Sequence, residues 1–328
     1  MCKDIGPTAE APDRMGSAVS IHAMQQKERV SAMGELIRLS DLLREELPDW
    51  DSECCMDAVP VDWAGSAPST GFERLDALLG GMPSEGLSLI AGRPGTGKTS
   101  FLVDLAIIAA KQGVPVTFFS LELGRRNLVQ RFLAAEACVG LHSLQRETPD
   151  KDLASIWQAA HELSGLQIYI SDDPIVDARD IEFLADKALS MYGAERGDRK
   201  PLVLVDYLQL LEAGQATNAV SRFDSAARSL KTVSKRMGCP VIAACQVMRR
   251  VEQRSGKKPC LDDLRYPSIE KYADAVLLIN RVASDDDRED LFMPRKGKAE
   301  LIAAKNVWGP TGSTILGFDD WCSRFIEL

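Results

Sequence analysis

The sequence predicts an α/β protein with a mostly parallel sheet that carries helices on both faces. Near-continuous runs of Val, Leu and Ile alternate with segments whose apolar residues recur at helical spacing, and such runs are typical of strands buried on both sides. One strand-to-helix junction carries the phosphate-binding loop pattern G-x-x-x-x-G-K-S/T, and a later strand ends in an acid. The length of 328 residues suits one large domain with an appendage, or two domains.

The positions of the strands and helices follow from these runs. Strands are expected at residues 87–91, 115–120, 167–171, 202–207, 240–245, 274–279, 299–304 and 313–318. Helices are expected at residues 99–111, 125–137, 151–163, 177–191 and 221–236. Because no helix separates the last two strands, we expect an antiparallel edge of the sheet there.

The N-terminal part differs in composition from the rest of the chain. Residues 1–19 are rich in Pro, Gly, Ala and charge, and we expect a disordered tail. Residues 20–46 have an amphipathic helical pattern, and a lone amphipathic helix must dock on this domain or on a neighbouring copy. Residues 47–66 contain prolines, glycine and several acids and predict a linker. The main domain is then expected at residues 67–328.

Composition excludes some classes of protein. The net charge of −9 argues against a globally basic nucleic-acid binder, although a local basic stripe is sufficient for such binding. No apolar run approaches the ~20 residues of a membrane span, and the first residues lack the apolar core of a signal peptide. The eight cysteines include no C-x-x-C pair. We therefore expect reduced thiols in a cytoplasmic protein that does not associate with membranes.

The phosphate-binding loop predicts ATP as the ligand. It follows the expected strand at 87–91 and opens the expected helix at 99–111, where backbone N–H groups and a helix N-terminus face phosphate oxygens. Lys98 is expected to reach the β- and γ-phosphates, and the Thr99 hydroxyl to ligate Mg²⁺. The residues expected to bind the nucleotide are Gly92, Arg93, Pro94, Gly95, Thr96, Gly97, Lys98, Thr99 and Ser100.

Three polar residues follow other predicted strands, whose carboxyl ends meet at one edge of a parallel sheet. Asp206 ends the apolar run Leu202–Asp206 and is expected to hold Mg²⁺, the alternative being a strand-end cap. Glu122 could orient or deprotonate the attacking water, or it could be a first-turn acid of the next helix. Gln246 could sense the γ-phosphate, or be a polar strand end.

Seven sequence blocks occur in an order that characterises one family. They are STGFERLDALLGG (69–81), GRPGTGKTSF (92–101), FFSLELGRRNLVQRFLAAEA (118–137), LVLVDYLQLL (202–211), RSLKTVSKRMGCPVIAACQVMRRVEQR (228–254), DLRYPSIEKYADAVLLINR (263–281) and KNVWGPTGS (305–313). Together they resemble the C-terminal RecA-like motor domain of the DnaB family of bacterial and phage replicative helicases. The SLE and DYLQL blocks are more specific than the phosphate loop alone.

This resemblance implies a RecA-like P-loop NTPase preceded by a helix at 20–46 that docks on the next subunit. It implies an ATP-dependent translocase on single-stranded DNA that forms a six-membered ring and acts in replication, with a primase or a helicase loader as candidate partners. The catalytic residues implied are Lys98, Glu122, Gln246 and Lys305. The DNA-binding residues implied are Arg249, Arg250, Arg254 and Arg265, for which a solvated surface is the alternative.

The chain departs from the family pattern in three places. About 66 residues stand where the family has a large N-terminal helical domain. Val307 replaces the arginine of the family's Lys-x-Arg-x-Gly, which acts as a finger on the neighbour's γ-phosphate. Loss of a finger costs roughly 10³–10⁵ in rate in related enzymes, so hydrolysis is expected to be weak, or to depend on Lys305 or a partner's arginine. The DNA loop, usually Arg-Glu-Ser-Gly, reads Arg-Tyr-Pro-Ser at 265–268, and proline has no N–H for a phosphate.

Two other functions are compatible with the sequence. A RecA- or RadA-type recombination ATPase shares blocks such as TGFERLDALLGG, but the SLE and DYLQL blocks favour the DnaB family. A non-enzymatic protein that binds ATP and modulates another helicase ring would account for Val307 and the short N-terminal part.

Overall fold

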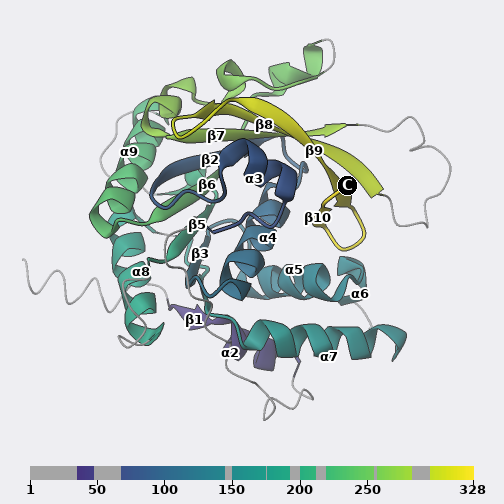
Figure 1. Cartoon of the computed structure of the whole chain (residues 1–328). Helices are drawn as coiled ribbons and strands as arrows, with labels where there is room; N and C mark the ends of the chain where they lie inside the picture. Colours follow the sequence, from purple (N-terminus) through teal and green to yellow (C-terminus); the bar gives the residue numbers. More distant parts are fainter. Residues whose placement is uncertain are drawn as a thin grey trace, which may run out of the picture. The chain divides into compact units, whose positions relative to one another are not determined.

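A computed structural model describes residues 35–47, 68–144, 150–174, 176–192, 200–211, 219–254, 257–282 and 296–328, all within the unit Glu35–Leu328. Within these residues a ten-stranded sheet has the order β1-β4-β3-β5-β6-β2-β7-β8-β9-β10 (Figure 1). Within the run β4-β3-β5-β6-β2-β7, adjacent strands are parallel to each other. The pairs β7–β8, β8–β9, β9–β10 and β1–β4 are antiparallel, which confirms the expected antiparallel edge.

The strands confirm the predicted α/β class. They are β1 (Ile37–Arg38), β2 (Gly86–Gly92), β3 (Val116–Ser120), β4 (Ile168–Ser171), β5 (Leu202–Asp206), β6 (Pro240–Gln246), β7 (Ala275–Val282), β8 (Lys296–Asn306), β9 (Gly312–Asp319) and β10 (Arg324–Ile326). The register places Gly92 opposite Gln246 and Ser120 opposite Asp206. The carboxyl ends of β2, β3, β5 and β6 therefore share one edge of the sheet.

Helices cover both faces of the sheet. They are α2 (Leu39–Glu46), α3 (Glu73–Leu79), α4 (Lys98–Lys111), α5 (Arg125–Ala137), α6 (Leu141–Leu144), α7 (Asp150–Ser164), α8 (Ala178–Tyr192) and α9 (Ala219–Met237). Residues of α2, α4, α5 and α7 share one buried core, and α8 and α9 share the other. Along β2, Leu89 and Ile90 point into different cores, as a pleated strand requires. In the part of the chain that is described, no helix has the length and apolar character needed to cross a membrane.

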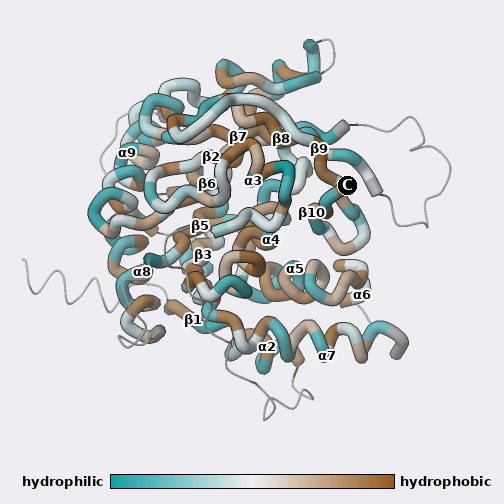
Figure 2. Tube along the Cα trace, viewed as in Figure 1, coloured by the Kyte–Doolittle hydropathy of each residue, from teal (hydrophilic) through white to brown (hydrophobic). Residues whose placement is uncertain are grey.

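Hydrophobic residues concentrate between these layers. Figure 2 shows brown, hydrophobic stretches along the central strands and along helix α4. Phe118 of β3 and Phe132 of α5 are both fully buried, and their rings meet edge to face at 6.1 Å. This packing fixes α5 against the sheet, and with it the chain between β3 and α5.

The N-terminal part of the unit differs from the helix expected at 20–46. Ile37 and Arg38 are extended and pair with Ile170 and Tyr169 of β4, so α2 begins only at Leu39. Its buried leucines pack against α5 and α7 of the same domain. Pairing at the sheet edge overrides the local helical pattern, because it satisfies backbone groups of both strands. Residues 20–34 lie outside the described part.

The C-terminal strand β10 closes the domain against α4. The Phe325 N–H donates to Asp104 Oδ2 at 2.8 Å, and the Phe325 ring meets those of Phe101 and Phe318 edge to face. Asp104 is 3% exposed. Burial raises the pKa of its carboxyl to about 8, although the Phe325 N–H and Arg324 favour the charged form. The end of the chain thus stabilises the helix that follows the phosphate loop.

Candidate active site

The phosphate loop joins the end of β2 to the start of α4. Gly97 has a φ of 93°, in the left-handed region, and a Cβ there would lie 2.9 Å from the ring of Phe318. Both the backbone and the packing therefore require glycine. The Lys98 Nζ donates to the Arg93 carbonyl at 2.9 Å, and the Thr96 hydroxyl donates to the same oxygen at 2.8 Å. The loop is thus folded around the ammonium, beside the N–H groups of the helix N-terminus.

Thr99 and Asp206 lie side by side next to this loop. The Thr99 hydroxyl donates to Asp206 Oδ2 at 2.6 Å, and Asp206, at the end of β5, is 1% exposed. Burial raises the pKa of Asp206, although the Thr99 hydrogen bond and the Lys98 charge favour its ionised form. A buried carboxylate beside a hydroxyl provides the oxygen ligands that Mg²⁺ prefers, so these two residues fit a magnesium site.

Glu122 is exposed and lies in the segment between β3 and α5. Helix α5 begins at Arg125, so Glu122 is not in its first turn. Its carboxylate lies close enough to act on the ionisation of Lys98 and Asp206. Burial lowers the pKa of Lys98, and the carboxylates of Asp206 and Glu122 oppose that shift. The predicted catalytic glutamate therefore lies near the predicted phosphate and magnesium residues.

Arg131 of α5 is a residue of this site that the sequence motifs do not indicate. Burial lowers the pKa of its guanidinium, while Asp206 and Glu122 oppose the shift. Within the described residues it forms no hydrogen bond or ion pair. Arg131 is half-buried, and a partly desolvated cation is stabilised by an anion that binds it. Arg131 therefore adds a positive charge to the side of the site formed by Glu122 and Asp206.

Gln246 and Arg265 meet at the same edge. Gln246 ends β6 opposite Gly92, where the phosphate loop begins. The Arg265 Nη1 donates to Gln246 Oε1 at 3.0 Å, and the charge of Arg265 also acts on Tyr207, which follows Asp206. Gln246, predicted as catalytic, and Arg265, predicted to bind DNA, are thus in direct contact.

The other predicted DNA-binding arginines divide into two groups. Arg249 is exposed and forms no hydrogen bond or ion pair within the residues described. Arg250 and Arg254 both bind the carboxylate of Asp263. Between them, Glu252 forms an ion pair with Arg93 of the phosphate loop. The segment therefore contacts the nucleotide site as well as carrying surface charge.

Lys305 does not lie with the other predicted catalytic residues. It pairs with Val276 near the start of β7, whereas the phosphate loop begins level with Ile279 farther along that strand. Its Nζ donates to the Glu270 carbonyl at 2.8 Å. Val307, two residues later, is 58% exposed. These two residues therefore lie apart from the chain's own phosphate loop.

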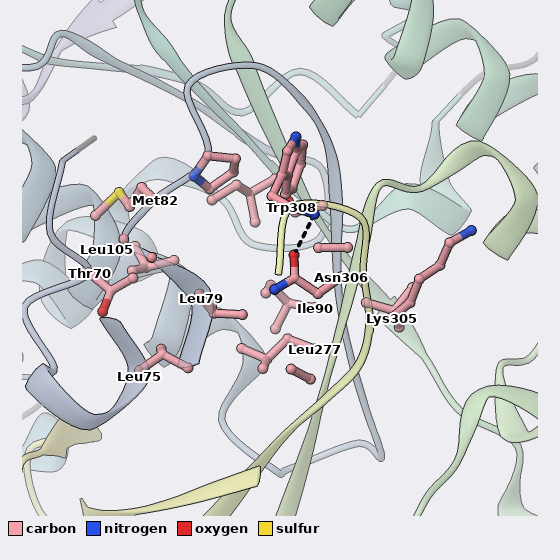
Figure 3. A pocket seen from close by; sticks show the side chains of 18 of the residues that line it. Thr70, Leu75, Leu79, Met82, Ile90, Leu105, Leu277, Lys305, Asn306 and Trp308 are labelled. Carbon is pink, nitrogen blue, oxygen red and sulfur yellow. Dashed lines mark hydrogen bonds between the residues drawn. The ribbon is translucent and has the colours of Figure 1, made fainter. Parts of the chain in front are cut away.

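A separate apolar cavity of about 230 Å³ lies beside this end of β8. It is lined by Ile90, Phe101, Leu277 and the exposed Trp308, among others (Figure 3). Lys305 also contributes to the lining, and in the same view its amino end extends away from the apolar residues. No residue of the phosphate loop lines the cavity. The cavity and the candidate active site are therefore distinct.

Comparison with known proteins extends this picture. The profile of the DnaB-like helicase C terminal domain family matches residues 68–327. The replicative DNA helicase DnaB of Leifsonia xyli is 35% identical over 266 residues, covering 79% of this chain and 55% of that protein. The replicative DNA helicase DnaC of Bacillus subtilis is 33% identical over 264 residues, with 79% and 56% covered. The chain thus spans about half the length of the curated relatives it matches.

Solved structures agree with this comparison. A DnaB-like replicative helicase, described together with its interactions with primase, superimposes with a TM-score of 0.70 at 27% identity, covering 87% of this chain and 65% of that one. A second solved structure, that of an ATPase domain, gives a TM-score of 0.69 at 27% identity, covering 87% of this chain and 96% of that one. A KaiC-like protein from Pyrococcus horikoshii shares the fold alone, with a TM-score of 0.51 at 17% identity. These matches confirm the resemblance and the RecA-like fold: the chain belongs to the DnaB-like helicase C-terminal domain family.

Proposed function

We propose that the chain is the motor of an ATP-driven, ring-forming translocase that unwinds DNA during replication. The observation that carries the proposal is the convergence of Lys98, the Thr99–Asp206 pair and Glu122 at one edge of the sheet. Relatives named as replicative DNA helicases, each matched over about half its length, support the choice of reaction and substrate. A cytoplasmic location is part of the same proposal.

The residues of the site have separate tasks in ATP hydrolysis. Lys98 and Arg131 bind the β- and γ-phosphates and stabilise the negative charge that develops during transfer. Thr99 and Asp206 would hold Mg²⁺, which, when bound, neutralises phosphate charge. Glu122 orients the attacking water and accepts its proton, and its exposed position leaves room for that water. Gln246 is the neutral group that senses the γ-phosphate.

A complete site requires a second copy of the chain. Lys305 and Val307 lie apart from their own phosphate loop, and we propose that they act on a neighbour's nucleotide. Valine cannot donate hydrogen bonds to a phosphate, so Lys305 would be the cation supplied by the neighbour. We propose a hexameric ring in which residues 20–34 contribute to docking between subunits. This arrangement predicts slower hydrolysis than in a ring with an arginine at position 307.

Single-stranded DNA would be bound by Arg249 and Arg265 without sequence preference. Arg249 is an exposed cation, and Arg265 donates a hydrogen bond to Gln246, which would link DNA binding to the nucleotide site. A primase is the partner that the related helicase structure suggests, and a helicase loader is a further candidate.

ATP turnover measured with and without single-stranded DNA tests the proposal. We expect DNA to stimulate turnover, Lys98→Ala to abolish it, and Glu122→Gln to retain ATP binding while losing hydrolysis. Normal hydrolysis by Glu122→Gln would contradict the assignment of the base. Val307 favours a second candidate, an ATP-binding modulator of another helicase ring. ATP binding without turnover, with or without DNA, would support that second function instead.

A further inference from the structure

The segment 247–264, which we call the basic loop, is closed at its base by backbone contacts. Val247 and Leu264 form an antiparallel bridge directly after β6. The Met248 N–H donates to the Asp263 carbonyl at 2.7 Å, and the Arg265 N–H donates to the Gln246 carbonyl at 3.0 Å. The loop therefore leaves the sheet and returns to the same point, and its conformation sets where Arg265 emerges.

A buried carboxylate occupies the centre of the basic loop. The side chain of Asp263 is 0% exposed. Its two oxygens accept a bidentate pair of bonds from Arg254, Nη1 to Oδ2 at 2.7 Å and Nη2 to Oδ1 at 3.0 Å. The Arg250 Nε donates to Oδ1 at 3.2 Å, and the Cys260 N–H donates to Oδ2 at 2.9 Å. One acid thus binds both arms of the loop.

The chemistry of this cluster restricts what Arg254 can do. Burial alone would raise the pKa of Asp263, but the hydrogen bonds from Arg254 and Cys260 hold it below the usual value. Moving Arg254 to a DNA phosphate would break two charge-assisted hydrogen bonds to a carboxylate that has no exposed surface, although the Arg254 side chain itself is 43% exposed. A planar guanidinium makes such a paired contact and an ammonium does not. Arg254 is therefore committed to the protein.

We propose that Arg254 is a positioning residue that acts through Asp263 to fix the basic loop, and with it Arg265, and that Arg249 rather than Arg254 contacts the DNA phosphate. This inference rests on the proposed function, because it assigns roles within the same DNA-binding surface. Arg250 supports the same carboxylate through a single bond. Within the described residues, the arginines at 249–254 then comprise two that are paired with Asp263 and one, Arg249, that has no ion pair.

Conservative substitutions separate the two roles, because lysine replaces a phosphate contact but not a bidentate clamp. We measure the affinity of the full chain for oligo(dT) over a range of salt concentrations. Arg254→Lys is expected to weaken binding about tenfold, and Arg249→Lys to stay within about twofold of the unchanged chain. Arg249→Gln should weaken binding and reduce the salt slope by about 0.7, the loss of one phosphate contact on a single strand.

Asp263→Asn distinguishes two roles of Asp263, because they predict changes of opposite sign in the affinity for DNA. If Asp263 merely restrained an arginine that binds DNA, its neutralisation would free that arginine and tighten DNA binding. The Arg254–Asp263 contact, which we call the clamp, predicts weaker binding instead, because the loop that positions Arg265 would lose its support. The rate of Cys260 alkylation, followed by peptide mass spectrometry, reports the clamp without DNA, because its Sγ lies 3.3 Å from Asp263 Oδ2. Arg254→Lys should accelerate this alkylation and Arg249→Lys should not.

The outcomes separate the positioning role of Arg254 from the proposed function of the chain. Oligo(dT) binding and Cys260 labelling that both match the unchanged chain in Arg254→Lys would overturn the positioning role. Tighter binding by Asp263→Asn would overturn it as well. If the unchanged chain fails to bind oligo(dT), the proposed function is wrong, and accelerated Cys260 labelling in Arg254→Lys would still establish the clamp. Melting temperatures close to that of the unchanged chain show that each variant is folded.

Discussion

The buried carboxyl of Asp104 makes the stability of the domain depend on pH. Its pKa in the folded protein is raised to about 8 from an ordinary value of 3.8. Between these values the folded state retains a proton that the unfolded state has released, so stability falls as pH rises. The contribution of this carboxyl to the unfolding free energy is complete below pH 3.8 and is lost progressively as the pH rises to about 8. The expected slope is about 1.4 kcal/mol for each unit of pH.

Asp104→Asn isolates this effect. The amide oxygen can still accept the Phe325 N–H, but the side chain has no proton to release. Relative to the unchanged chain, the variant should gain about 3 kcal/mol in unfolding free energy between pH 5 and pH 7. Other titrating groups are the same in both proteins, so they cancel in the difference.

Urea denaturation at pH 5, 6 and 7, followed by circular dichroism, measures the difference. Glu73→Gln, which neutralises an exposed acid of α3, is the matched control and should leave the slope unchanged. Parallel pH profiles for the unchanged chain and Asp104→Asn would refute the reasoning. They would mean that Asp104 is ionised in the folded domain, with Arg324 as its counter-charge.

Three further predictions concern the motor. Arg131→Gln should lower kcat by about 10²–10³ while Arg131→Lys loses less, measured by steady-state ATP turnover, and an unchanged kcat would exclude Arg131 from the phosphate site. Val307→Arg should raise turnover by at least about tenfold at protein concentrations that support assembly, and no change there would mean that position 307 does not reach a neighbour's phosphate. Removal of residues 1–34 should leave the unit Glu35–Leu328 folded but lower its mass on a sizing column, and an unaltered ring would rule out a docking role for 20–34.

Local patterns predicted the elements whose signal is contained in a few consecutive residues. The phosphate loop and the acid at the end of β5 were found because a strand, its end and the following turn are adjacent in sequence. The register of β2, β3, β5 and β6 then brought Gly92, Ser120, Asp206 and Gln246 to one edge, as parallel packing requires.

Features that depend on packing between distant segments could not be read in this way. The role of Arg131 can be recognised only once α5 packs against the sheet, because this packing brings Arg131 near Asp206. In the sequence, Arg254 and Arg249 are both arginines of one basic run. Their different roles become visible only in the structure, where Arg254 is paired with Asp263. The pairing of Ile37 with Ile170 joins segments that no local periodicity relates, and the strand Ile37–Arg38 interrupts the helix expected at 20–46.

The distance between the phosphate loop and the Lys305–Val307 turn has a practical consequence for enzymology. If one copy holds the nucleotide and the next supplies the ammonium, dilution separates the two halves of a single reaction centre. Specific activity should then decline as total protein falls, and mixtures of two differently impaired chains should recover turnover that neither shows alone. An assay performed at a single low protein concentration would then record no activity, although each chain is intact and only the neighbouring subunit has dissociated.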